Sequence, residues 1–205
     1  IPVWEKMVTV CREAMAMPDA GNILMFLPGT HEIRKTIELL EGGSVSRGWD
    51  VFPLYSSLPP AAQEAAITPG NKPKIIVATN VAETSLTIEG VRTVIDSGLA
   101  RISSYEARRG INTLLVKKIS RAAAEQRAGR AGRTASGRAF RLWSEADHAR
   151  RAEFESPEVH RVDLAEAVLL LKAAGVSEIR DFRWFDAPKE DALVRAETLL
   201  HDLGA

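Results

Sequence analysis

The sequence has one cysteine, few histidines and no long apolar run, and each shortage excludes a class of protein. The lone Cys11 rules out a disulfide framework and a multi-cysteine zinc site, and it fits a reducing compartment such as the cytoplasm. We assign no metal to the scattered histidines, which are His31, His148, His160 and His201. Because no stretch of about 18 apolar residues is present, the sequence predicts no membrane-spanning helix.

The chain also lacks an initiator Met and a signal pattern. It opens Ile1-Pro2-Val3-Trp4, so we expect it to be part of a longer protein. With 45% hydrophobic and 26% charged residues among 205, the composition excludes intrinsic disorder. This length allows one domain of ordinary size and a small appendage.

The net charge is zero, but the charges are unevenly distributed. Residues 101–150 hold 12 Lys and Arg against 4 Asp and Glu, whereas the rest of the chain holds 15 and 23. Cations concentrated in one quarter of a neutral chain indicate a polyanionic partner. A solvated basic surface explains the charge equally well.

Strand-length apolar runs alternate with helix-length amphipathic stretches. This alternation predicts an α/β fold with a largely parallel sheet covered by helices on both faces. The expected strands are 23–27, 51–55, 74–78, 93–95 and 138–143, with helices around 33–40 and 60–67. Pro53 forbids a fully paired central position for its strand. Residues 102–105 and 113–118 predict a β-hairpin with a basic tip at Arg108-Arg109-Gly110.

Small and hydroxylic residues follow four of the expected strands. They are Pro28-Gly29-Thr30, Ser56-Ser57, Thr79-Asn80 and Ser97-Gly98. The carboxyl ends of parallel strands meet at one edge of the sheet, where ligands bind. Free backbone N–H groups and hydroxyls at this edge predict a phosphate-binding rim, although each segment alone is an ordinary turn former.

The character of the chain changes near Ser156. We expect residues 1–155 to form the α/β domain and residues 156–205 to begin a small helical module. The helices expected in that module cover about 162–173 and 192–203.

An Arg-rich segment is the most informative part of the sequence. We expect a helix from Arg121 to about Gly132, on which Gln126, Arg130 and Arg133 fall within about 60° of one another. Two guanidiniums and an amide suit a phosphate whose negative charge grows during transfer. A solvent-facing Arg helix is the alternative.

That alternative leaves the two glycines of the segment unexplained. Gly129 and Gly132 each cost about 1 kcal/mol within a helix, which indicates that another surface approaches closely there. The chain has neither a Gly-x-x-x-x-Gly-Lys-Ser/Thr phosphate loop nor an Asp-Glu dipeptide. We therefore expect it to be inactive alone and to complete a nucleotide site whose other half lies elsewhere.

Several segments, in this order, resemble motifs of the DEAH-box (DEAH/RHA) helicases. Residues 26–29 resemble motif IV, 54–59 the segment after it, 78–90 motif V and 126–133 motif VI. The hairpin between motifs V and VI and Phe140-Arg141-Leu142-Trp143 also agree with this family. Thr87-Ile88-Glu89-Gly90 and Leu142-Trp143-Ser144-Glu145 favour its bacterial, HrpB-like branch.

The resemblance implies the second RecA-like lobe of an ATP-driven helicase that moves 3′ to 5′ on single-stranded RNA. It does not decide whether such a protein also accepts DNA. It implies that ATP and Mg²⁺ are held mainly by the first lobe, and that residues 156–205 begin a winged-helix module. By the match of motifs, Gln126 would position the attacking water, and Arg130 and Arg133 would contact the γ-phosphate. Ser85 would sense the nucleotide and Glu89 would lie near the ribose.

The resemblance also implies a set of residues for the nucleic acid. Those expected to hold its backbone are Gly29, Ser57, Thr79 and Asn80. Arg108 and Arg109 form a candidate strand separator, and a plain surface hairpin is an equal alternative. Glu89 is longer than the Asp of many relatives, and Ile67 stands where several place an aromatic ring against adenine. We therefore expect loose nucleotide preference.

Two other functions are compatible with the residues alone. One is a nucleic-acid-binding or adaptor module without catalysis. The other is a subunit that donates Arg130 and Arg133 in trans to a separate ATPase.

Overall fold

The computed structural model describes residues 1–42, 46–84, 86–106, 109–133 and 135–205. It divides into two compact units, residues 1–101 with 116–155 and residues 102–115 with 156–205. The assignment of the second unit to a winged-helix module stays a prediction. Among the described residues, no helix has both the length and the apolar character needed to cross a bilayer.

The first unit is built around a five-stranded sheet with the order β2-β3-β1-β4-β7. All pairs are parallel. The strands are β1 (Asn22–Phe26), β2 (Asp50–Leu54), β3 (Lys74–Ala78), β4 (Val91–Asp96) and β7 (Arg138–Arg141). The predicted parallel α/β fold is confirmed, and Pro53 lies in the edge strand β2, as its missing N–H requires.

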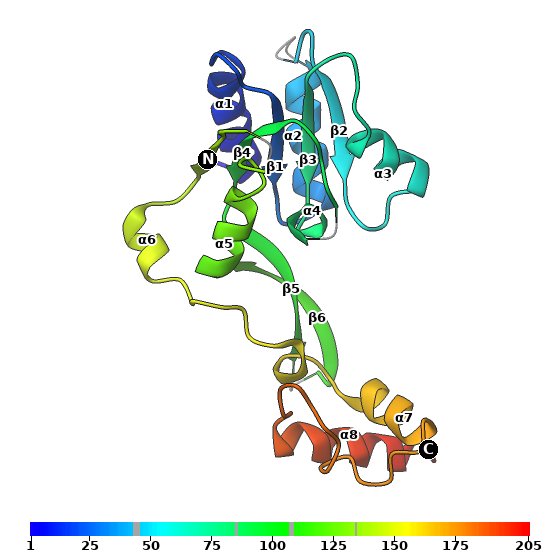
Figure 1. Ribbon diagram of the computed structural model, residues 1–205. Coiled ribbons are helices and arrows are strands. Elements are labelled where there is room, and N and C mark those ends of the chain that lie inside the picture. Colours follow the sequence, from blue (N-terminus) through cyan, green and yellow to red (C-terminus); the bar gives the residue numbers. More distant parts are fainter. Residues whose placement is uncertain (43–45, 85, 107–108, 134) are drawn as a thin grey trace. The chain divides into compact units, whose positions relative to one another are not determined.

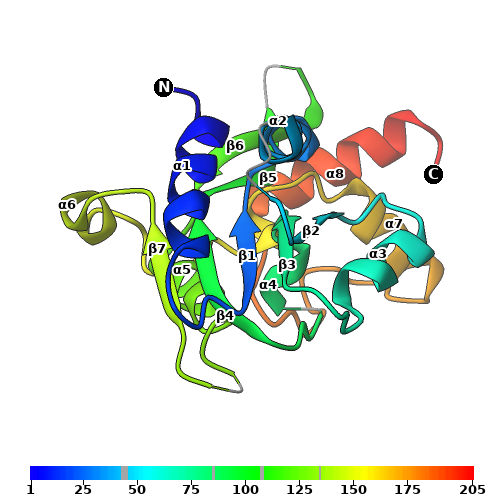
Figure 2. The ribbon, with the colours of Figure 1, turned by 90° about the horizontal axis from the view of Figure 1, so that it is seen from above.

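Helices cover both faces of this sheet. The first unit contains α1 (Val3–Met15), α2 (Thr30–Gly42), α3 (Pro60–Ile67), α4 (Val81–Thr84), α5 (Arg121–Ala128) and α6 (Glu145–Ala149). Alternate strand residues point to opposite faces, so Ile23 and Met25 pack with α1 and α2, whereas Leu24 and Phe26 pack with α3 and α4. Figure 2 shows these helix pairs on the two sides of the central strands.

The Arg-rich helix is shorter than predicted. Helix α5 ends at Ala128, and the chain continues from Gly129 in tight turns. Arg130 N–H donates to the Arg127 carbonyl at 3.1 Å, three residues back rather than four. The expected end near Gly132 is therefore wrong, because a segment with two glycines does not maintain the α-helical hydrogen-bond ladder.

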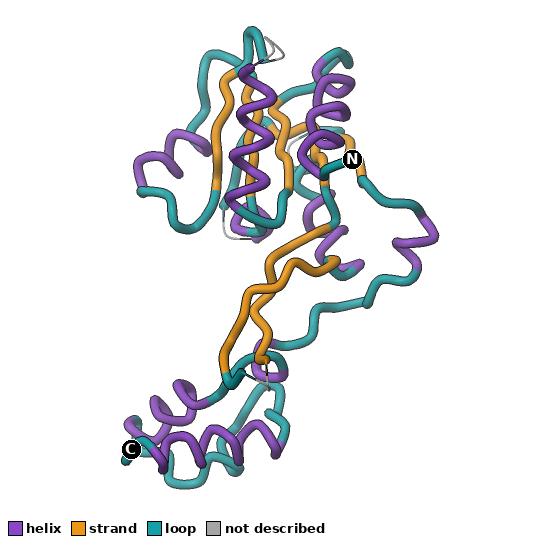
Figure 3. Tube along the Cα trace, turned by 180° about the vertical axis from the view of Figure 1, so that it is seen from behind, coloured by secondary structure: helices purple, strands orange, loops and turns teal. Residues whose placement is uncertain are grey.

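The second unit combines the outer part of a hairpin with the helical tail. Strands β5 (Leu99–Glu106) and β6 (Ile111–Lys118) form the hairpin, and Figure 3 traces them as a separate two-stranded ribbon. The tail contains η1 (Glu158–His160), α7 (Ala165–Ala173) and α8 (Glu190–Asp202). Its core joins Leu164, Val168, Leu193 and other apolar residues, and the Arg161 guanidinium donates to the Ser103 carbonyl at 2.7 Å.

Candidate functional site

A hollow in the first unit brings together Gln126, Arg130 and Arg133, the three residues of the Arg-rich segment that were predicted to converge. Its volume is about 340 Å³, and it is lined by Glu83, Thr84, Gln126, Gly129, Arg130 and Arg133. Helix α4 supplies the first two, helix α5 supplies Gln126, and the turns after α5 supply the rest. Gln126, Arg130 and Arg133 therefore converge, even though helix α5 ends at Ala128.

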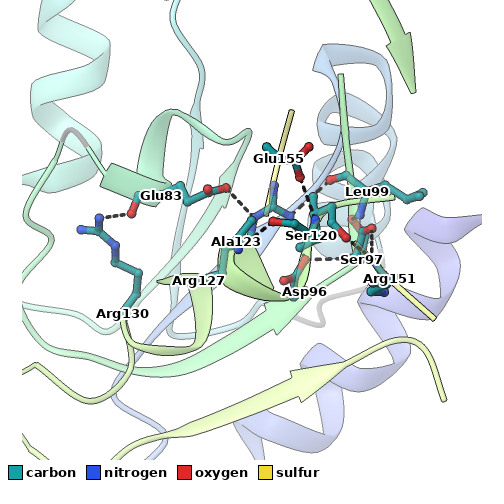
Figure 4. Close-up of polar contacts among 12 residues, drawn as sticks. Glu83, Asp96, Ser97, Leu99, Ser120, Ala123, Arg127, Arg130, Arg151 and Glu155 are labelled. Atoms are coloured by element: carbon teal, nitrogen blue, oxygen red, sulfur yellow. Dashed lines mark hydrogen bonds and ion pairs between the residues drawn. The ribbon is translucent and has the colours of Figure 1, made fainter. Parts of the chain in front are cut away.

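Arg130 is anchored to the opposite wall of the hollow. Arg130 is only 7% exposed to solvent. Nη1 donates to the Leu86 carbonyl at 2.8 Å, and Nη2 donates to the Glu83 carbonyl (Figure 4). Burial and the neighbouring Arg133 cation lower the pKa of Arg130, while Glu83 opposes this shift. The guanidinium is thus held in a fixed position while it lines the hollow.

Arg133 and Gln126 are exposed at the same hollow. Nη1 of Arg133 lies 3.3 Å from the Thr87 hydroxyl, a weak contact that a stronger acceptor can replace. One anchored guanidinium, one exposed guanidinium and an amide form a site that suits an oxyanion.

A larger hollow lies beside the edge of the sheet. It measures about 500 Å³ and is lined by residues of α2 together with Pro53 and Tyr55. Its lining includes Thr30 of the predicted phosphate-binding rim but none of the residues predicted to contact the nucleotide, so its size does not make it the candidate. Among the described residues, no group of three His, Cys, Asp or Glu side chains could hold a metal ion.

The residues predicted for nucleic acid follow the carboxyl ends of β1, β2 and β3. Gly29, Ser57, Thr79 and Asn80 therefore lie toward one edge of the sheet. Ser57 and Asn80 are exposed, whereas Gly29 is buried. A Cβ on Gly29 would lie 2.6 Å from Nε of Arg101, so the Arg101 side chain covers this glycine.

The structure does not bring Glu89 or Ile67 into the hollow. Glu89 precedes β4, where its carbonyl accepts a bond from the Asn22 amide at 2.8 Å, at the opposite edge of the sheet. Arg109 is exposed and lies 3.7 Å from Glu106 in the hairpin. Ile67 is half-buried and packs against the core. Ser85 and Arg108 lie outside the described residues.

Sequence reasoning missed Arg127, which lies next to the hollow. This side chain is fully buried and pairs with Glu83 and Asp96, each at 2.9 Å. Its position in the helix could have revealed it. Arg127 lies four residues after Ala123 and three after Ala124, on the same buried face of α5. A charge at that position indicates a buried ion pair.

Comparisons with known proteins agree with this architecture. Residues 5–135 match the family described as "Helicase conserved C-terminal domain". A Saccharomyces cerevisiae protein described as the probable ATP-dependent RNA helicase DHR2 is 38% identical, over 98% of this chain and 29% of its own length. The ATP-dependent RNA helicase HrpA homolog of Haemophilus influenzae is 41% identical, over 90% of this chain and 14% of its own length.

Solved structures are similar over the whole chain. Two crystal structures of Escherichia coli HrpB, one described as a DExH-box NTPase and the other as a DEAH/RHA helicase, cover all of this chain at 34% identity. The TM-scores are 0.87 and 0.91, and the match spans 25% and 26% of those chains. This chain thus spans less than a third of each of these relatives. With the motifs, the RecA-like sheet and these matches in agreement, the chain belongs to the helicase C-terminal domain family, in the DEAH-box (DEAH/RHA) group and its HrpB-like branch.

Proposed function

We propose that this chain is the second motor lobe of an ATP-dependent RNA helicase and completes a nucleotide site formed with a first lobe. The observation that carries this proposal is the convergence of Gln126, Arg130 and Arg133 on one hollow. The names of the relatives support ATP and RNA as its substrates.

In this proposal, the two guanidiniums stabilise the negative charge that develops on the transferred phosphate, and Gln126 orients the attacking water. Fixed donors cost little reorganisation during the reaction, and the anchored Arg130 is such a donor. The residues that line the hollow include one carboxylate, that of Glu83, and this carboxylate already pairs with Arg127. We therefore assign the metal and most of the triphosphate to the first lobe.

Nucleic acid would bind along the carboxyl edge of the sheet. Closing and reopening of the nucleotide cleft would move this edge along the strand. Contacts from Ser57, Thr79 and Asn80 would go to phosphate and sugar, so binding would depend on salt more than on sequence. We propose 3′-to-5′ movement; unwinding of duplexes with a 3′ tail but not a 5′ tail tests it.

The central test is Arg130→Ala in a protein that contains this chain and a phosphate-loop lobe. Loss of one arginine finger is expected to reduce kcat for ATP by roughly 10³- to 10⁵-fold. The matched control is Arg121→Ala, which removes a partly exposed arginine at the start of α5 that does not line the hollow. Equal turnover in both variants would overturn the proposal. The chain alone is expected to show no ATP turnover.

A further inference from the structure

Arg127 is a charged side chain placed where a protein normally tolerates only apolar groups. Among the described residues, it heads the fully buried side chains by volume. Burying a guanidinium costs several kcal/mol unless charged and hydrogen-bonding partners compensate. A simple apolar residue would fill this space without that cost, so the charge itself needs an explanation.

The partners of Arg127 come from two different elements. Nε donates to Glu83 Oε2 of α4 at 2.9 Å, and Nη1 donates to Asp96 Oδ1 of β4 at 2.9 Å. Nη1 also lies 3.2 Å from the Leu99 carbonyl, and the guanidinium lies 4.8 Å from the centre of the Phe26 ring. Arg127 therefore links the one-turn helix α4 to the end of a central strand.

Glu83 connects this buried ion pair to the candidate site. Its carboxylate binds Arg127, and its backbone carbonyl accepts a hydrogen bond from Arg130 (Figure 4). The same residue thus faces Arg127 with its side chain and Arg130 with its main chain. A displacement of Glu83 would move the carbonyl that holds Arg130.

Helix α4 cannot hold that carbonyl in place unaided. It comprises only Val81–Thr84, and an isolated turn of helix is unstable because nucleation is unfavourable. Its position depends on tertiary contacts, of which Ala82 in the core and the Glu83–Arg127 pair are two. The ion pair is made by the same residue whose carbonyl binds Arg130.

We infer that Arg127 is a positioning residue for ATP hydrolysis, which fixes Glu83 and thereby the guanidinium of Arg130. This inference rests on the proposed role of Arg130. Arg127 itself would not touch the nucleotide, and its effect would pass through Arg130.

The test is Arg127→Lys in the protein that contains both lobes. Lysine keeps the charge but lacks the planar fork that reaches Glu83 and Asp96 together. A misplaced Arg130 is expected to lower kcat for ATP about 10- to 100-fold. The KM for ATP should change less than about twofold, because the lost interaction acts mainly in the transition state.

A matched control separates positioning from stability. Arg151 is also buried; it donates to the carbonyls of Gly98 and Ile119 and lies 4.2 Å from the Trp143 ring, but it does not line the hollow. Arg151→Lys should lower Tm as Arg127→Lys does, while kcat stays within about twofold of the parent. Equal kcat losses in the two variants would overturn the inference.

A double-mutant cycle tests the route through Arg130. In an Arg130→Ala background, Arg127→Lys should lower kcat less than about twofold further, because the group that it positions is absent. Independent, multiplying effects would overturn the inference while leaving the proposed function intact. An Arg130→Ala variant with full turnover would overturn both.

If Arg127→Lys does not fold, Glu83→Gln decides the question. Glutamine keeps the backbone carbonyl and the side-chain shape but removes the charge that pairs with Arg127, and the Glu83 side chain is already 17% exposed. A fall in kcat of about 3- to 10-fold with little change in Tm is expected, since a charged hydrogen bond is weakened rather than lost. Unchanged kcat would contradict positioning through Glu83.

Discussion

The backbone of Gly137 lies directly against the carbonyl of Ala131, in the turns that carry Arg130 and Arg133. A Cβ on Gly137 would lie 1.9 Å from the Ala131 oxygen, a distance that no side chain tolerates. Gly137→Ala must therefore displace one of the two segments. We expect a loss of about 1–3 kcal/mol in the free energy of unfolding, measured by chemical denaturation. ATP turnover should fall with it, because the displaced turns line the hollow. A variant of parental stability would contradict this packing.

Gly132 differs from Gly137, because no contact among the described residues requires its lack of a side chain. A Cβ there would meet no atom within 4 Å. Gly132→Ala should therefore leave Tm of the isolated chain unchanged or slightly higher. If another lobe approaches this glycine closely, the same substitution should slow ATP turnover by about 10-fold or more in the two-lobe protein. Full turnover would show that the predicted close approach lies elsewhere.

The strands show what could be predicted from the sequence. The run Lys74–Ala78 is buried on both sheet faces as β3, with the predicted bounds, because a central parallel strand needs mainly apolar side chains on both sides. Helix α1 is not among the expected elements, although Met7, Cys11 and Ala14 follow helical spacing on its buried face.

The ion pairs of the site show what could not be predicted. Glu83 and Asp96 lie 44 and 31 residues from Arg127 in sequence, and only the packing of α5 against the sheet brings them together. The convergence of Gln126, Arg130 and Arg133 was predicted from a continuous helix that is not there. The turns after Ala128 and the anchoring of Arg130 produce it instead.

Lys74 offers a stability prediction away from the candidate site. Its buried ammonium donates to the Ala65 carbonyl at 2.7 Å and to the Thr68 carbonyl at the end of α3, and it lies 4.5 Å from the Phe52 ring centre. Lys74→Met leaves these carbonyls without their donor, at an expected cost of about 1–3 kcal/mol in unfolding free energy. The exposed Lys72 is the control, and Lys72→Met should change the free energy of unfolding by about 0.5 kcal/mol or less.

The thiol of Cys11 should be inert in the folded protein. Burial raises its pKa to about 12, so the reactive thiolate is scarce near neutral pH. A thiol reagent at pH 8 should label Cys11 only after unfolding in denaturant. Because the folded pKa is raised, the thiol's contribution to stability is complete below the unfolded pKa and declines as pH rises toward about 12. Cys11→Ala should remove that decline, and rapid labelling of the native chain would contradict the burial.

Asn80 provides the sharpest test of nucleic-acid binding at the carboxyl edge. It is exposed just beyond β3, while Asn71 is exposed before the same strand, at its amino end. Asn80→Asp adds one negative charge without disturbing the start of α4. Asn80 directly precedes this helix, and Asp and Asn stabilise a helix equally well from the position just before its first residue. The added charge should weaken single-stranded RNA binding by about 1 kcal/mol at low salt, and less at high salt. Asn71→Asp carries the same charge to the opposite edge, so fluorescence anisotropy with a labelled oligonucleotide should show parental affinity. If the two variants bind equally well, RNA does not follow the carboxyl ends of these strands.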